Sequence, residues 1–127
     1  MPSLPRVAAV DIGTNTVLLL VAEVVGGELR ALADRATVTR IGQGVDASGR
    51  LLPEAEARTL ACLARYADEA RALGAFPVTA AGTSALRDAK GGGDFLDRAA
   101  ALLGERPRVL SGEDEARATF AGALSGL

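Results

Sequence analysis

The chain has no histidine and a single cysteine, and both shortages restrict its chemistry. The lack of histidine excludes Ser-His-Asp catalysis, Cys-His catalysis and histidine metal sites from this chain. The single cysteine, Cys62, cannot form an intrachain disulfide, which favours an intracellular, cytoplasmic location. Cys62 lies in a predicted helix, where we expect a small buried apolar residue rather than a reactive thiol.

Excess charge and long apolar runs are also lacking. The 14 Lys and Arg residues nearly balance the 16 Asp and Glu residues, and no basic tract is interleaved with aromatic side chains. A nucleic-acid partner is therefore not expected, and a polyanion would have to be held by backbone amides, a few arginines and a metal. No apolar stretch reaches the roughly 20 residues that span a bilayer, and the N-terminus lacks the pattern of a signal peptide, so no membrane partner is expected.

The composition that is present is that of one globular domain. The 127 residues are about one domain's worth, so we expect a single domain over residues 1–127. Apolar residues make up 49% of the chain and aromatic residues only 3%, so the core must be built from Ala, Leu and Val.

The pattern of apolar residues and turn residues predicts an α/β fold. Strands are expected at residues 6–11, 17–25, 28–39, 76–81 and 108–110, helices at 53–73, 95–103 and from Ser111 onward, and loops at 40–52 and 82–89. Gly26-Gly27 predicts a hairpin turn, Pro53 suits a first helical position, and Asp94 is a candidate N-cap. The order β-β-β-α-β-α-β-α predicts a mixed five-stranded sheet, in which the first three strands are antiparallel and the later ones parallel.

The segment between the first two strands carries the strongest indication of function. Asp11 ends a short apolar strand, and Gly13, Thr14, Asn15 and Thr16 form a polar turn before the next apolar run. Successive backbone N–H groups in such a turn can converge on an anion, and a carboxylate at the strand end can hold a divalent cation. The pattern fits a site for a metal-bound phosphate and also fits an ordinary hairpin turn.

Four segments, in one order along the chain, resemble those of a known family. They are residues 10–16 (VDIGTNT), 40–44 (RIGQG), 81–89 (AGTSALRDA) and 110–116 (LSGEDEA). Together they resemble the Ppx/GppA family of exopolyphosphatases and guanosine pentaphosphate phosphatases. Two departures are small: Gly82 separates Ala81 from Thr83, and Asp114 stands where the family has the first Glu of a pair.

The resemblance implies both a fold and an activity. The fold is a ribonuclease-H-like lobe of the actin, Hsp70 and acetate-kinase superfamily, and the activity is Mg²⁺-dependent hydrolysis of a terminal phosphoanhydride of inorganic polyphosphate or guanosine pentaphosphate. By matching positions, Asp11 would help hold the metal and the turn 13–16 would bind phosphate. Arg87 matches an arginine near the phosphate chain, and Arg40 is a second candidate for phosphate binding. Glu115 matches the family's proposed general base, which activates the attacking water.

Other interpretations stay open from the residues alone. Glu115 also suits the dipole at a helix start, and Arg87 has Asp88 as an adjacent partner. An ATP-dependent kinase lobe of the same superfamily and a non-catalytic domain that binds a phosphorylated nucleotide are alternatives to the phosphatase.

The family's second phosphate motif, Asp-x-Gly-Gly-Gly-Ser, does not occur before Leu127. We therefore expect the N-terminal lobe of a two-lobed enzyme, with little or no activity by itself. Its missing partner would be the C-terminal lobe of the same enzyme, and apolar surface left open by that lobe would also permit a homodimer.

Overall fold

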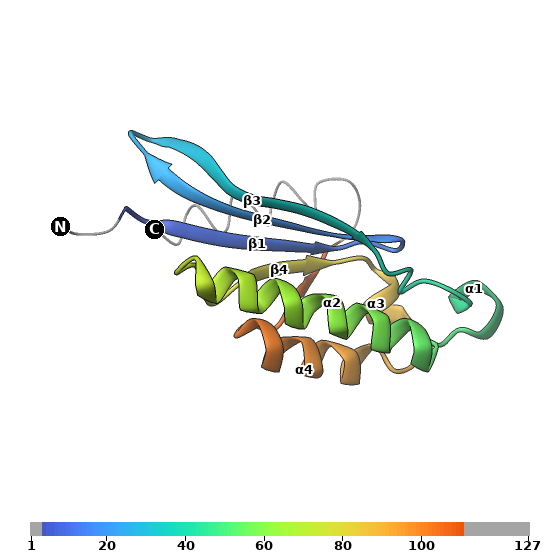
Figure 1. Ribbon diagram of the computed structural model, residues 1–127. Coiled ribbons are helices and arrows are strands. Elements are labelled where there is room, and N and C mark those ends of the chain that lie inside the picture. Colours follow the sequence, from blue (N-terminus) through green and yellow to red (C-terminus); the bar gives the residue numbers. More distant parts are fainter. Residues whose placement is uncertain (1–3, 111–127) are drawn as a thin grey trace.

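The computed structural model describes residues 4–110, which form a mixed sheet with strand order β3-β2-β1-β4-β5 (Figure 1). The strands are β1 (Arg6–Ile12), β2 (Thr16–Val25), β3 (Glu28–Val38), β4 (Thr79–Gly82) and β5 (Arg108–Val109). The helices are α1 (Val45–Ser48), α2 (Pro53–Ala72), α3 (Ala85–Asp88) and α4 (Gly92–Leu103). The sheet has antiparallel β1–β2 and β2–β3 pairs and parallel β1–β4 and β4–β5 pairs, so the predicted five-stranded mixed sheet is confirmed.

The first three strands form a meander because short turns join them. Gly26 and Gly27 make the turn between β2 and β3 with φ angles of 58° and 81°, a conformation that side chains disfavour. In the middle of the sheet, Asp11 of β1 lies opposite Leu18 of β2 and Ala81 of β4. Because β1 and β4 run parallel, the loops that follow both strands leave the same edge of the sheet.

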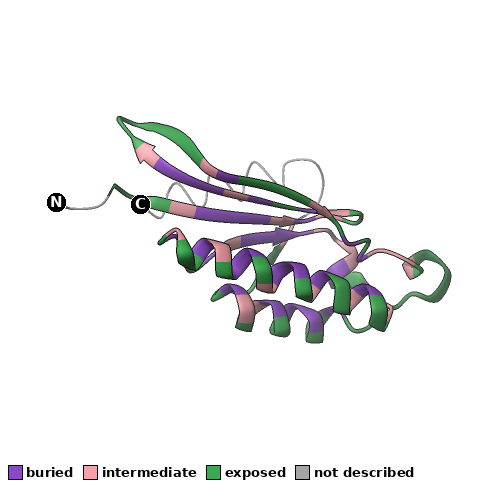
Figure 2. Cartoon of the chain, in the orientation of Figure 1, coloured by how far each residue is buried: buried purple, intermediate pink, exposed green. Residues whose placement is uncertain are grey.

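The core lies between the sheet and the pair α2 and α4, which cover one face of it (Figures 1 and 2). Alternate strand residues such as Val10, Val17 and Leu19 are buried against these helices. From the helices come Leu63 and Phe95, among other residues. Cys62 is fully buried in this core, as predicted.

Helix α4 starts earlier than predicted. Its N-cap is Gly91, with a φ of 89°, so Asp94 is not the cap but an acidic residue in the first turn. The reason is a close contact: a Cβ on Gly92 would lie 1.9 Å from the Leu86 carbonyl oxygen. The glycine cluster therefore lets α4 begin directly against α3, rather than forming a flexible loop.

Other boundaries also differ from the prediction. Strand β4 begins at Thr79 instead of residue 76, because Pro77 has no N–H for a strand ladder. The expected loops at 40–52 and 82–89 each contain a four-residue helix, α1 and α3. The predicted final helix lies outside the described residues. No helix within residues 4–110 is long and apolar enough to cross a bilayer.

Candidate functional site

In the turn between β1 and β2, two carbonyl groups accept hydrogen bonds from another part of the chain, whereas two backbone N–H groups have no protein acceptor within residues 4–110. The Gly13 N–H donates to the Thr16 carbonyl at 3.0 Å and closes the turn. The Thr14 and Asn15 carbonyls accept hydrogen bonds from the loop that follows β3. Within residues 4–110, the Thr14 and Asn15 N–H groups donate to no protein acceptor. Both residues are exposed, so these donors are available to an anion.

The loop after β3 packs so closely on this turn that it requires a glycine. The Gly42 N–H donates to the Thr14 carbonyl at 3.0 Å. A Cβ on Gly42 would lie 2.3 Å from the Thr14 methyl carbon, and a Cβ on Gly13 would lie 2.8 Å from the Thr16 carbonyl oxygen. Two glycines of the predicted motifs are therefore explained by close packing at the turn.

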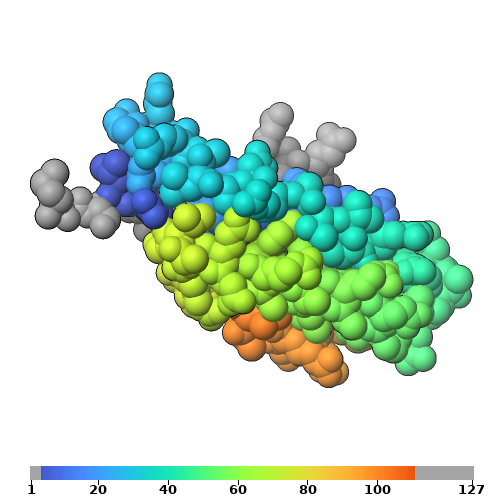
Figure 3. Space-filling model, in the orientation of Figure 1, coloured from blue at the N-terminus to red at the C-terminus, as the bar shows by residue number. Residues whose placement is uncertain are grey.

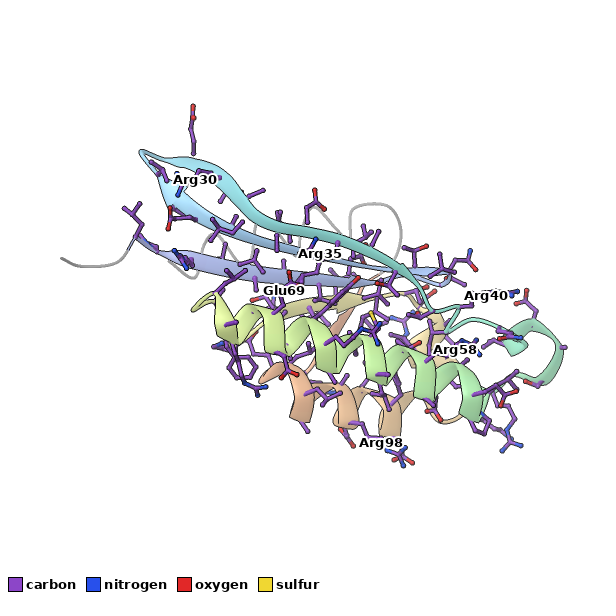
Figure 4. The ribbon with its side chains drawn as sticks, viewed as in Figure 1. Arg30, Arg35, Arg40, Arg58, Glu69 and Arg98 are labelled. Atoms are coloured by element: carbon purple, nitrogen blue, oxygen red, sulfur yellow. The ribbon has the colours of Figure 1, made fainter. Side chains whose placement is uncertain are left out.

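Arg40, a predicted phosphate-binding residue, lies beside the turn. Its N–H donates to the Asn15 carbonyl at 3.0 Å. Its φ of 55° makes it the only non-glycine residue with a positive φ in the described part of the chain. The Arg40 side chain is exposed (Figure 4). The backbone at Arg40 thus turns the chain from β3 toward the loop that contains Gly42.

Asp11 lies next to the turn on the sheet itself. Val10 and Ile12 point into the core, so the alternation of a strand directs Asp11 to the face opposite α2 and α4. Its side chain is half-buried, and this burial raises the pKa of the Asp11 carboxyl above its ordinary value of 3.8. A positive ion at this carboxylate would offset the cost of its charge.

The loop after β4 forms a second wall of the site, which the sequence analysis did not assign. The Thr83 N–H donates to the Ile12 carbonyl at 3.1 Å, which extends the pairing of the parallel strands. The Thr14 hydroxyl donates to the Thr83 hydroxyl at 3.3 Å. The parallel β1–β4 pair was predicted, and the rule that ligands bind at the carboxyl ends of such strands could have identified Thr83.

A hollow of about 350 Å³ lies between these segments. It is lined by Thr14, Gly42, Val45, Asp46, Thr83, Ser84, Ala85 and Asp88. Arg87 is not part of this lining; its Nε lies 3.2 Å from the carboxylate of Asp88, so the pairing with Asp88 that the sequence left open is present. The hollow combines hydroxyl groups with two carboxylates beside the unused N–H groups of the turn.

Comparison with known proteins gives these features a context. The sequence model of the Ppx/GppA phosphatase family matches residues 20–127. The chain belongs to the Ppx/GppA phosphatase family. The resemblance noted from four short segments is thereby confirmed over most of the chain.

Relatives of two kinds match this Ppx/GppA chain. Exopolyphosphatase 2 of Mycobacterium tuberculosis is 40% identical over 98% of the chain, which spans 42% of that protein. The guanosine-5'-triphosphate,3'-diphosphate pyrophosphatase of Photobacterium profundum is 33% identical over 95% of the chain, which spans 24% of that protein. The chain thus covers less than half the length of these relatives.

Solved structures of the family share the fold. The Ppx/GppA family member of Aquifex aeolicus matches 87% of the chain with a TM-score of 0.80 and 31% identity, and the match covers 36% of that protein. An exopolyphosphatase of Cytophaga hutchinsonii matches 95% of the chain with a TM-score of 0.81 and 27% identity, and the match covers 39% of that protein. The predicted α/β lobe of the ribonuclease-H-like type is therefore confirmed.

Two predicted site residues need separate mention. Within residues 4–110, Asp11 is not part of any group of three or more His, Cys, Asp or Glu residues suited to a metal. Glu115, the predicted general base, lies outside the described residues.

Proposed function

We propose that this chain forms the phosphate-binding wall of a hydrolase. The enzyme would release orthophosphate from the terminal phosphoanhydride of inorganic polyphosphate or guanosine pentaphosphate. Water would form the new bond to the terminal phosphorus, and the bridging P–O bond would break. The observation that carries the proposal is the β1–β2 turn of a Ppx/GppA chain, whose Thr14 and Asn15 N–H groups have no acceptor within residues 4–110. Thr14 also lines a hollow that contains hydroxyl groups and the carboxylates of Asp46 and Asp88.

The turn would bind phosphate mainly through positioned donors. Phosphoryl transfer depends on positioning and on neutralising charge, and these N–H groups are fixed before substrate arrives. The Thr14 hydroxyl donates to the Thr83 hydroxyl, which keeps its own O–H and would add one donor at the same place. Arg40 and Arg87 would contact phosphate oxygens, Arg87 after it exchanges its Asp88 partner for the substrate.

The residues present fit a magnesium ion that arrives with the substrate. Mg²⁺ usually keeps several waters and is held by one or two carboxylates together with substrate phosphates, so a lone carboxylate beside a phosphate turn is sufficient. Asp11 would hold the ion, directly or through water, and the unfavourable burial of its charge would be relieved. The metal would supply neutralisation of phosphate charge.

Two further parts of the proposal concern residues that the described segment does not include. Glu115 would act as the general base that orients or deprotonates the attacking water. Because the chain spans less than half of its relatives, the opposite wall of the cleft would come from a second lobe. We propose that this chain alone has little or no activity.

The test is phosphate release by the natural full-length protein, with polyphosphate and guanosine pentaphosphate as separate substrates and Mg²⁺ varied. We expect Mg²⁺-dependent release that falls at least about 100-fold in Asp11→Asn, since oriented charges are worth several kcal/mol in phosphoryl transfer. Asp34→Asn, an exposed acid on β3, is the matched control and should keep the wild-type rate. Unchanged Mg²⁺ dependence in Asp11→Asn would refute the role of Asp11.

A further inference from the structure

Helix α2 lies along strand β3 and the loop that follows it (Figure 3), and an arginine makes a contact across this seam at each of two places. In the middle of the seam, Arg35 of β3 pairs with Glu69 of α2 at 2.8 Å. Near the turn, Arg58 of α2 donates from Nε to the Thr39 carbonyl at 3.0 Å and from Nη2 to Gln43 Oε1 at 2.5 Å. Figure 4 shows Arg58 at the end of α2 close to Arg40, while Arg35 and Glu69 lie farther along the seam.

Residues 39–43, here named the brace loop, connect Arg58 to the turn between β1 and β2. This turn, residues 13–16, is here named the phosphate turn after its proposed role. The Thr39 and Arg40 N–H groups both donate to the Asn15 carbonyl at 3.0 Å. The Gly42 N–H donates to the Thr14 carbonyl, also at 3.0 Å. Arg58 therefore contacts the loop directly, and the loop in turn holds both carbonyls of the turn. The Thr14 carbonyl shares its peptide plane with the Asn15 N–H, so the contact from Gly42 sets the direction of that donor, and the Asn15 carbonyl anchors the end of the turn.

The brace loop is held in an unfavourable conformation. Arg40 has a left-handed backbone with a φ of 55°, which crowds the Cβ of a residue that carries a side chain. The Thr39 side chain is buried, and its hydroxyl has no hydrogen-bond partner in the described part of the chain. Such strain persists only where surrounding contacts impose it, and it concentrates at functional sites. The Arg58 guanidinium donates one hydrogen bond to Thr39 and one to Gln43, and this two-headed contact helps to hold the loop in its strained conformation.

We propose that Arg58 is a positioning residue for phosphate binding: it holds the brace loop so that the turn presents its N–H groups to the substrate. This inference rests on the proposed function of the turn. Arg58 does not line the hollow and donates to Thr39 and Gln43, so we assign it no contact with the substrate. Because the turn would bind phosphate before and during the reaction, loss of Arg58 should raise KM more than it lowers kcat.

The chain offers a matched control for a merely structural arginine. Arg35→Ala removes the other α2–β3 arginine contact and leaves the brace loop intact. Both Arg35→Ala and Arg58→Ala should lower Tm, because each breaks a contact across the same seam. Only Arg58→Ala should change how the turn binds phosphate.

The experiment measures steady-state kinetics of polyphosphate and guanosine pentaphosphate hydrolysis with the natural full-length protein. Arg58→Ala should raise KM about tenfold, because a hydrogen-bonded charged group typically contributes that much. Arg35→Ala should leave KM within about twofold of the wild type. Arg58→Lys keeps the charge but not the two-headed contact, so its KM should also rise. If Arg58→Ala fails to fold, Arg58→Lys and Gln43→Ala carry the same test.

Hydrogen–deuterium exchange supplies a second readout that does not depend on activity. Peptides that contain residues 13–16 and 39–43 should exchange faster in Arg58→Ala but not in Arg35→Ala. An unchanged KM in Arg58→Ala, a wild-type KM in Arg58→Lys, or equal exchange in the two alanine variants would overturn the inference. If the wild-type protein hydrolyses neither substrate, the proposed function fails, and exchange alone decides whether Arg58 orders the turn.

Discussion

At the scale of single residues, Asp11 shows that stability and the proposed activity conflict. Its carboxyl is half-buried on the sheet, and burial raises its pKa because the charged form loses hydration. Metal binding requires the charged form. The charged carboxylate therefore destabilises the fold at neutral pH, and in the proposed function a bound cation would offset that cost.

Replacement of Asp11 by Asn should stabilise the purified chain at pH 7. The pKa of the Asp11 carboxyl in the folded state is above its ordinary value of 3.8. The wild type therefore loses stability as the pH rises from 3.8 through the folded-state pKa, because the folded chain must then carry a half-buried charge. Below pH 3.8 both the folded and unfolded wild-type chains are protonated, and the difference from Asp11→Asn should disappear. Thermal unfolding from pH 3 to pH 7 checks this. A difference in Tm that is the same at every pH would contradict it.

Arg40 allows backbone strain and side-chain charge to be separated. Arg40→Gly and Arg40→Ala both remove the guanidinium, but only glycine tolerates the φ of 55°. The glycine variant should be about 1 kcal/mol more stable than the alanine variant in denaturant unfolding. Both variants should raise KM for a phosphate substrate equally if Arg40 binds phosphate. A wild-type KM in both would remove Arg40 from the proposed site.

At the scale of elements, adjacent glycines at the start of α4 have different roles. Gly92 lies against the Leu86 carbonyl, whereas a Cβ on Gly93 would meet nothing within 4 Å. Gly92→Ala should lower the free energy of unfolding by about 1–3 kcal/mol, because the backbone must move to admit a methyl group. Gly93→Ala should raise it by about 0.5–1 kcal/mol, because alanine favours the helix. Urea unfolding distinguishes the two, and equal effects would contradict this account.

The sequence was sufficient for those elements that depend on local patterns. Alternating apolar residues and Gly26-Gly27 predicted the meander, and the helical spacing after Pro53 predicted α2. The predicted start of α4 was wrong because Gly92 packs against the Leu86 carbonyl of α3. No local sequence pattern encodes that contact between two helices. The site was incomplete for the same reason. Thr83 joins the phosphate turn through a contact 69 residues along the chain.

At the scale of the whole molecule, the described residues leave some large apolar side chains in contact with solvent. One face packs on α2 and α4, and large apolar side chains remain exposed elsewhere, including Leu18 and Val38. Leu18 alternates with the buried Val17 and Leu19, so it belongs to the face opposite the helices. From the sequence we expected exposed apolar surface where a second lobe would pack, and that role of this surface stays a prediction.

The purified chain of residues 1–127 should self-associate through this surface. Light scattering with size-exclusion chromatography should show a mass that rises with concentration toward that of a dimer. Leu18→Ser should weaken the association, because it removes apolar area from the exposed face. Val25→Ser, an exposed apolar residue at the end of β2 that alternates onto the helix side of the sheet, is the control and should not. A monomer at every concentration would refute the prediction.

The residues of the site are far apart in the sequence, and this separation has a consequence for biosynthesis. The phosphate turn leaves the ribosome early, but its hydroxyl partner Thr83 follows 69 residues later. Closing so long a loop is slow compared with forming a local hairpin, so the meander can exist before the site does. A nascent chain that has not yet paired β1 with β4 would carry the motif without the pocket. Phosphate binding by partly synthesised chains should therefore begin only after β4 has emerged.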